Sequence, residues 1–148
     1  MNLARLALVI SALSAPVAAQ DYHVGQIAIT RPVLRVASPV SKTGAGYMTI
    51  SNSGSRPDRL IAVITVAAAR SDMHGSFAQG TIVQMRAQAG GVPIPAGGRV
   101  QFAPGGLHVM FIGLRAAVPV GTKVPAKLVF ARAGRVDVVF TAQGFAAP

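Results

Sequence analysis

The chain has 148 residues, with 14 Lys and Arg against 4 Asp and no Glu, and it contains neither Cys nor Trp. Apolar residues make up 51% of the sequence and charged residues only 12%, which supports one packed domain and excludes a disordered charged tail. Without Cys, the chain cannot form a disulfide scaffold, a thiol nucleophile, an iron–sulfur cluster or a blue-copper site, so only His and Met could hold a soft metal ion.

The first twenty residues have the pattern of a secretory signal. Arg5 is followed by an apolar run over residues 6–13, and the small residues Val17 and Ala19 precede a cleavage position after Ala19. The apolar run is too short for a permanent transmembrane helix. We therefore predict a signal peptide over residues 1–19 and an exported domain over residues 20–148 with no permanent membrane insertion. The absence of a Cys to carry a lipid or a disulfide favours a periplasmic location.

Short β-branched or apolar runs dominate the rest of the chain, and no stretch has a helical period. The predicted strands cover residues 23–30, 33–37, 47–51, 59–68, 71–78, 81–88, 99–102, 107–114, 124–131 and 136–141. Gly, Pro, Ser and Asn separate these runs, as expected of turns between antiparallel strands. The pattern predicts a single all-β domain, a sandwich with Greek-key connections.

The formal net charge of +10 raises the question of a polyanionic partner. Lys and Arg residues are spread singly along the chain, and aromatic residues make up only 5% of it, so basic runs with interleaved stacking side chains are missing. We expect the charge to keep an apolar protein soluble. No nucleic-acid partner is predicted.

A hairpin in the middle of the chain carries the first candidate ligands. Gln79-Gly80 lies between two alternating runs, and glycine tolerates the positive φ that a tight hairpin turn requires. If these two residues form the turn, His74 lies directly opposite Met85 with Cβ atoms about 5 Å apart. The same register sends Met73 to the other face, and a bulge at Gly75 would shift it.

His108 and Met110 form a second His/Met pair, because alternate residues of a strand project from the same face. A single Met is usually a core residue, as we expect for Met48, and a single His is usually structural. Two imidazoles and two thioethers together form a soft, neutral ligand set that suits Cu(I), whereas Mg²⁺ and Ca²⁺ prefer oxygen ligands and zinc seldom binds thioethers. We therefore predict that a Cu(I) ion is bound by His74, Met85, His108 and Met110.

The spacing of these four residues resembles the His/Met motif of the PCuAC periplasmic copper chaperones. Ten residues separate His74 from Met85, twenty-two separate Met85 from His108, and one separates His108 from Met110. Other segments resemble that family in the same order along residues 27–139, namely Gly46-Tyr47-Met48-Thr49-Ile50-Ser51-Asn52, Asp58-Arg59-Leu60, Ile94-Pro95-Ala96-Gly97-Gly98 and Pro104-Gly105-Gly106-Leu107-His108-Val109-Met110.

The resemblance implies a cupredoxin-like sandwich that holds Cu(I) near its surface and passes it to an acceptor, typically toward the CuA centre of cytochrome oxidase. We expect such a chaperone to act as a monomer. The chain departs from the family where Val33-Leu34-Arg35 replaces a common Trp-Ala-Arg and where Gly75 replaces the Glu that usually follows the first His. The sequence after the domain is not rich in Met or His, which puts a second site for Cu(II) in doubt.

An enzyme is not predicted from this sequence. The chain has no Glu, its four Asp residues occur singly, and no Ser lies in a Gly-x-Ser-x-Gly motif. Asp72, two residues before His74, could either orient an imidazole or remain a solvated charge. The alternative to a copper chaperone is an exported adhesion or scaffold module in which the His and Met residues simply pack.

Overall fold

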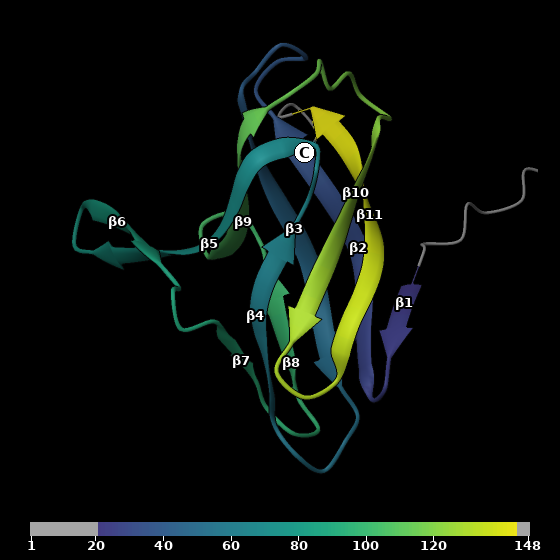
Figure 1. The fold of residues 1–148 in the computed structure, drawn as a ribbon. Coiled ribbons are helices and arrows are strands. Elements are labelled where there is room, and N and C mark those ends of the chain that lie inside the picture. Colours follow the sequence, from purple (N-terminus) through teal and green to yellow (C-terminus); the bar gives the residue numbers. More distant parts are fainter. Residues whose placement is uncertain (1–20, 145–148) are drawn as a thin grey trace, which may run out of the picture.

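A computed structural model describes residues 21–144 of the protein, and within them the chain forms eleven β-strands and no α-helix (Figure 1). The strands are β1 Asp21–Val24, β2 Ile27–Val36, β3 Thr43–Asn52, β4 Asp58–Ile64, β5 Ala68–Gln79, β6 Ile82–Ala87, β7 Val92–Ile94, β8 Arg99–Phe102, β9 Leu107–Leu114, β10 Lys123–Phe130 and β11 Gly134–Gly144. The predicted all-β class is confirmed. The predicted signal peptide over residues 1–19 lies outside the described residues.

The predicted strands over residues 99–102 and 107–114 coincide with β8 and β9. The single strand predicted over residues 23–30 is wrong, because the chain reverses at Gly25, whose φ is 55°, and β1 pairs back onto β2. The strand predicted over residues 59–68 is too long, since β4 ends at Ile64. Three-residue β7 was not predicted, because its run is too short to show alternation.

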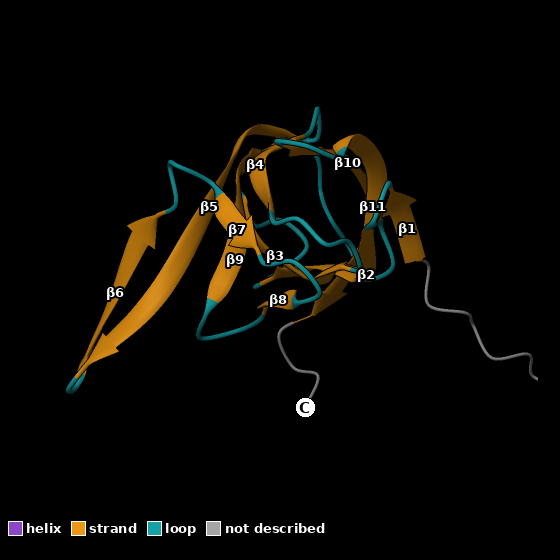
Figure 2. Cartoon of the chain, turned by 90° about the horizontal axis from the view of Figure 1, so that it is seen from below, coloured by secondary structure: helices purple, strands orange, loops and turns teal. Residues whose placement is uncertain are grey.

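The strands follow one continuous path of neighbours, β6-β5-β9-β8-β3-β2-β11-β10-β4-β7, with β1 beside β2 and β9 also paired with β3. This path folds into two facing layers (Figure 2). Strand β11 joins the layers, because it pairs antiparallel with β10 along residues 134–141 and parallel with β2 along residues 141–144. No helix among residues 21–144 is long and apolar enough to cross a membrane.

The core lies between the two layers, and alternation along the strands builds it. In β2, β3, β9 and β10 nearly every second residue is buried. The largest fully buried side chains include Phe111, Phe140, Leu34, Ile50 and Leu128. Met48 and Met73, only 2% and 8% exposed, also belong to this core, as predicted. Each of these strands therefore has one face toward the core and one outer face.

Gly46 marks a close approach of β3 to the aromatic centre of the core. A Cβ atom at this position would lie 2.8 Å from the Phe111 ring and 3.1 Å from the Phe140 ring. These two rings pack edge to face with their centroids 5.3 Å apart, so neither can move without disturbing the other. The absence of a side chain at Gly46 is thus required by packing.

We expect Gly46→Ala to lower the free energy of unfolding by about 1 to 3 kcal/mol, because an added methyl group overfills the core. Urea unfolding measures the change. Gly90→Ala is the matched control, since a Cβ there meets no atom within 4 Å, and it should change stability by less than about 0.5 kcal/mol. Equal stability of Gly46→Ala and the parent would contradict the tight packing of the two rings against β3.

Candidate metal centre

The outer face of β9 carries two of the predicted ligands. His108 and Met110 alternate along β9 with Val109 and Phe111, both of which are fully buried in the core. Antiparallel pairing with β5 places His74 directly opposite His108 and Asp72 directly opposite Met110. The His74 and His108 rings meet edge to face with centroids 5.7 Å apart. Three of the four predicted ligands thus lie on one face of two neighbouring strands.

The predicted pairing of His74 with Met85 is wrong. Strand β5 runs through Gln79, and the two turn residues are Gly80, with φ 64°, and Thr81. Glycine at the first central position suits a type II′ turn. Because the turn lies one residue later than predicted, each residue of β5 pairs with a residue two positions further along β6 than predicted. Met85 therefore lies opposite Ser76, and His74 lies opposite Ala87.

A shift of two residues keeps every side chain on its face. Met85 remains on the same outer face as His74, as a diagonal neighbour with Cβ atoms about 7 to 8 Å apart. All four predicted ligands consequently share the outer face of β6, β5 and β9. The part of the prediction that depended on alternation holds, and the part that depended on turn position does not.

His108 has an unusual environment for a residue on an outer sheet face, because it is only 5% exposed. Its Nδ1 lies 3.0 Å from the carbonyl oxygen of Gly106. A carbonyl only accepts hydrogen bonds, so Nδ1 carries the proton and Nε2 keeps its lone pair in the neutral ring. Nε2 is buried and has no hydrogen-bond partner. A buried lone pair without a partner is unfavourable by about 1 to 3 kcal/mol, which a metal ion bound there would offset.

His108, Met110 and Met85 line a common hollow of about 350 Å³. The other lining residues are Arg35, Ala37, Thr43, Gly44, Ala45, Tyr47, Ser76 and Gly105. His74 is not among them, although its ring meets that of His108. Met85 is 65% exposed, since β6 extends away from the sandwich as the outer strand of a two-stranded arm formed with β5 (Figures 1 and 2). The hollow is therefore open to solvent beside Met85.

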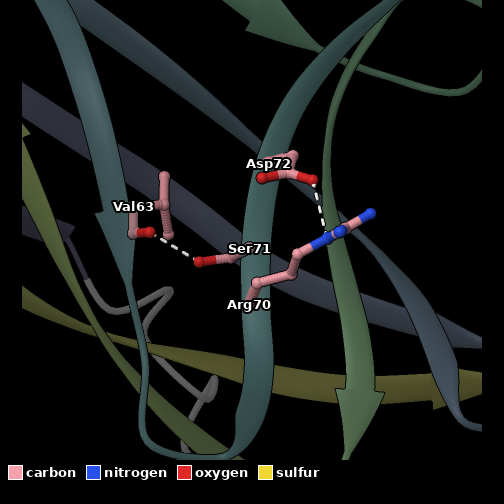
Figure 3. Close-up of polar contacts among 4 residues, drawn as sticks. All are labelled: Val63, Arg70, Ser71 and Asp72. Atoms are coloured by element: carbon pink, nitrogen blue, oxygen red, sulfur yellow. Dashed lines mark hydrogen bonds and ion pairs between the residues drawn. The ribbon is translucent and has the colours of Figure 1, made fainter. Parts of the chain in front are cut away.

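Asp72 does not orient an imidazole. Its carboxylate forms an ion pair with Arg70 at 3.1 Å between Nε and Oδ2 (Figure 3). Ser71 points the other way and donates a hydrogen bond to the carbonyl of Val63 on β4 (Figure 3). Among residues 21–144 there is no group of three or more His, Asp or Glu that could hold a metal. A metal ion at this face would consequently depend on the thioethers.

Two residues of the hollow were not predicted to belong to the site. Arg35 and Tyr47 come from the outer faces of β2 and β3, and the Arg35 guanidinium carbon lies 6.0 Å from the centre of the Tyr47 ring. Burial raises the pKa of the Tyr47 hydroxyl, and the nearby positive charge of Arg35 partly opposes that rise. Alternation could place both residues outward, but only the pairing of β2, β3 and β9 brings them to His108 and Met110.

Asp58, from the Asp58-Arg59-Leu60 segment, is one of the residues that line a separate hollow of about 240 Å³. The Asp58 carboxylate accepts hydrogen bonds from the backbone amides of Arg59, Arg132 and Ala133 at 2.7 to 2.9 Å. Buried Asn52 beside it is bonded to the backbone of Gly54 and Arg56. These side chains tie loops together, so this motif has a structural role in the fold.

We expect the Nδ1–H tautomer of His108 to predominate in the metal-free protein at pH 8. Long-range proton–nitrogen correlation spectra distinguish the two ring nitrogens directly. The more exposed His23 on β1 serves as the internal comparison, since it lies outside the hollow. A predominant Nε2–H form of His108 would contradict the assignment of a free, buried lone pair.

Comparison with solved structures places this fold in a known class. The chain is similar to the apo PmoF2 PCuAC domain, with 31% identity, a TM-score of 0.72 and coverage of 86% of this chain and 98% of that one. It is similar to the copper-bound PCuAC domain from PmoF2, with 30% identity, a TM-score of 0.71 and coverage of 84% and 98%. Apo-DR1885 from Deinococcus radiodurans shares the fold at 23% identity, with a TM-score of 0.64 and coverage of 99% and 98%. The fold is that of a PCuAC domain.

Sequence comparison then gives the family. The chain belongs to the family described as "Putative lipoprotein LpqE-like", whose model matches residues 27–142. It is also 30% identical over 86 residues to "Putative lipoprotein Lxx21020" from Leifsonia xyli subsp. xyli (strain CTCB07), a match over 58% of this chain and 52% of that protein. The chain therefore spans about half the length of this curated relative. The predicted resemblance to PCuAC proteins is confirmed.

Proposed function

We propose that this protein carries one Cu(I) ion on the outer face of β6, β5 and β9, bound by His74, Met85, His108 and Met110. The observation that carries the proposal is the buried Nε2 of His108, which lacks a hydrogen-bond partner, in a residue that lines the same hollow as Met85 and Met110. The similarity to a copper-bound PCuAC domain supports the same conclusion. A module in which these residues only pack would need neither an unpaired buried nitrogen nor an exposed methionine.

The donor set favours Cu(I) over the other common metals. Neutral imidazole and thioether ligands suit a soft monovalent ion, and thioethers need not lose a proton to bind. Hard ions such as Ca²⁺ and Mg²⁺ require oxygen ligands, and the one acidic side chain of the region, Asp72, is already paired with Arg70. The chain's lack of Cys leaves these four side chains as its soft ligands at this face.

The distribution of the ligands suits a carrier rather than a permanent site. His108 is almost fully buried, whereas Met85 is 65% exposed on the arm. An acceptor can therefore displace Met85 first and the more buried ligands afterwards, so the ion always keeps some bonds during transfer. The proposed role is transport of copper without chemical conversion, which distinguishes the protein from an enzyme.

The proposed location follows from the sequence, and the proposed acceptor follows from the resemblance to the PCuAC chaperones. A signal peptide over residues 1–19 would export the domain of residues 20–148 to the periplasm, where it would act as a monomer. The family description as a lipoprotein is compatible with export. We propose a copper protein of the same compartment as the acceptor, with the CuA centre of cytochrome oxidase as the first candidate.

Cu(I) titration against a chromophoric chelator should give one ion per chain. Met85→Leu and Met110→Leu remove the sulfur lone pair at nearly constant volume, so each should lower the affinity at least tenfold, or about 1.4 kcal/mol. Met48→Leu and Met73→Leu are matched controls because both side chains lie in the core. They should bind Cu(I) like the parent, with a stability loss below about 1.5 kcal/mol.

Parent-like affinity of both Met85→Leu and Met110→Leu would exclude the thioethers as ligands. A parent that binds no Cu(I) in this titration would favour the alternative of an exported adhesion or scaffold module. A loss of affinity in the core variants as large as that in the surface variants would show that folding, and not ligation, controls the measurement.

Transfer tests the acceptor separately. Mixing the Cu(I)-loaded protein with a metal-free CuA domain, followed by separation of the two proteins, should leave the copper on the CuA domain. Loaded Met85→Leu should transfer faster than the parent, because the exposed bond that an incoming ligand must replace is already missing. Retention of all copper by the parent would argue against CuA as the acceptor while leaving Cu(I) binding intact.

A further inference from the structure

Arg35 shares a transverse row of the sheet with three residues of the outer face. Arg35 on β2 pairs with Ala45 on β3, Ala45 pairs with Met110 on β9, and Met110 pairs with Asp72 on β5. Neighbouring strands are about 4.8 Å apart, so the backbone positions of Arg35 and Met110 are separated by about 10 Å. The small side chain of Ala45 between them leaves the space over β3 open, and Arg35 and Met110 line the same hollow.

The positive charge of Arg35 has no counter-ion in this row. The ion pairs among the described residues join Arg70 with Asp72 and Lys127 with Asp137, and Arg35 belongs to neither. Its Nε is buried without a hydrogen-bond partner, and its guanidinium lies over the Tyr47 ring. Since Asp72 is neutralised by Arg70, the site combines one uncompensated guanidinium with four neutral donor side chains.

We propose that Arg35 makes the site selective for monovalent copper, because its uncompensated charge in the hollow disfavours a divalent ion more than a monovalent one. This inference rests on the proposed Cu(I) site and names a residue that sets its specificity without binding the metal. Coulomb repulsion scales with the charge of the bound ion. The penalty for Cu(II) or Zn²⁺ is accordingly twice the penalty for Cu(I).

A packing role or a net-charge role for Arg35 would have different consequences. A residue that only packs against Tyr47 would affect binding of both ions equally through the shape of the hollow. If Arg35 acted only through the net charge of the protein, removal of any other surface arginine would change the metal affinities by the same amount. An exposed ion pair contributes little, but Arg35 forms no pair, and its half-buried position beside the hollow limits screening by salt.

The test compares the affinities for Cu(I), Cu(II) and Zn²⁺ in Arg35→Gln and Arg35→Met, in a His23→Ala background that removes a competing imidazole on β1. If the backbone separation of about 10 Å is taken as the scale of the charge separation, an effective dielectric constant of about 20 gives a change in affinity of about three- to tenfold per unit of ion charge once exposure is allowed for. We expect both variants to bind Cu(I) about threefold more tightly and the divalent ions about tenfold more tightly. Arg35→Lys should resemble the parent.

Arg135→Gln is the matched control, since this exposed arginine of β11 carries the same charge and lies outside the hollow. Its affinities should equal those of the parent. Because Nε of Arg35 has no acceptor to leave unpaired, both neutral variants should fold, and thermal unfolding verifies this.

Equal changes for monovalent and divalent ions in the Arg35 variants, or no change, would overturn the inference. The same selectivity change in Arg135→Gln would also overturn it, because net charge would then be the cause. A parent that binds no Cu(I) would refute the proposed function itself, whereas a parent that binds Cu(I) with variants of unchanged selectivity would refute only the role of Arg35.

Discussion

The antiparallel register between β5 and β9 determines how the two imidazoles of the candidate site meet. On the outer face it places His74 opposite His108, and on the inner face it places Met73 opposite Val109. Met73 and Val109 are buried in the core, so a slip by one residue would expose Met73 and turn His74 into the apolar interior. The hydrophobic pattern that stabilises the fold therefore also holds the two imidazoles together, with no separate interaction required for that purpose.

The site combines a rigid part with an exposed part. His108 and Met110 stand on β9, whose inner residues belong to the core, and a hydrogen bond from His108 to Gly106 orients the buried ring. By contrast, every residue of β6 is exposed, and Met85 reaches the site only because the β5–β6 hairpin holds it there. A soft ion bound by both parts would be held on one side by ligands fixed in the sandwich and on the other side by a ligand that a partner protein can reach. That asymmetry is what a protein needs if it is to bind an ion tightly and still give it up.

The alternation of residues along each strand was enough to predict which face of the sheet each candidate ligand lies on. The runs over residues 99–102 and 107–114 are bounded by Gly and Pro turns, so their strands were predicted with the observed bounds. Alternation also placed His108 with Met110 and kept Met85 on the face of His74. The partner of Met85 was wrong because a Gly80-Thr81 turn and a Gln79-Gly80 turn differ by two residues in register, and the sequence pattern fits both. Arg35 and Tyr47 were missed because they reach the hollow only through the pairing of β2 with β3 and of β3 with β9, which is distant in sequence.

The environment of each charged residue likewise depends on strand pairing that the sequence does not reveal. Counted along the sequence, fourteen Lys and Arg residues against four Asp describe a cationic protein, and no single arginine stands out. In three dimensions Arg70 is paired with Asp72, while Arg35 forms no ion pair and lines a hollow together with neutral candidate ligands. Two arginines on the same sheet thus have opposite consequences, since Arg70 pairs with Asp72, whereas Arg35 would add a repulsive field that a bound cation has to overcome. In the proposed site the hollow is positively charged before any metal enters. It would hold a cation only through ligand bonds strong enough to exceed that repulsion, and soft ligands form such bonds with a soft monovalent ion.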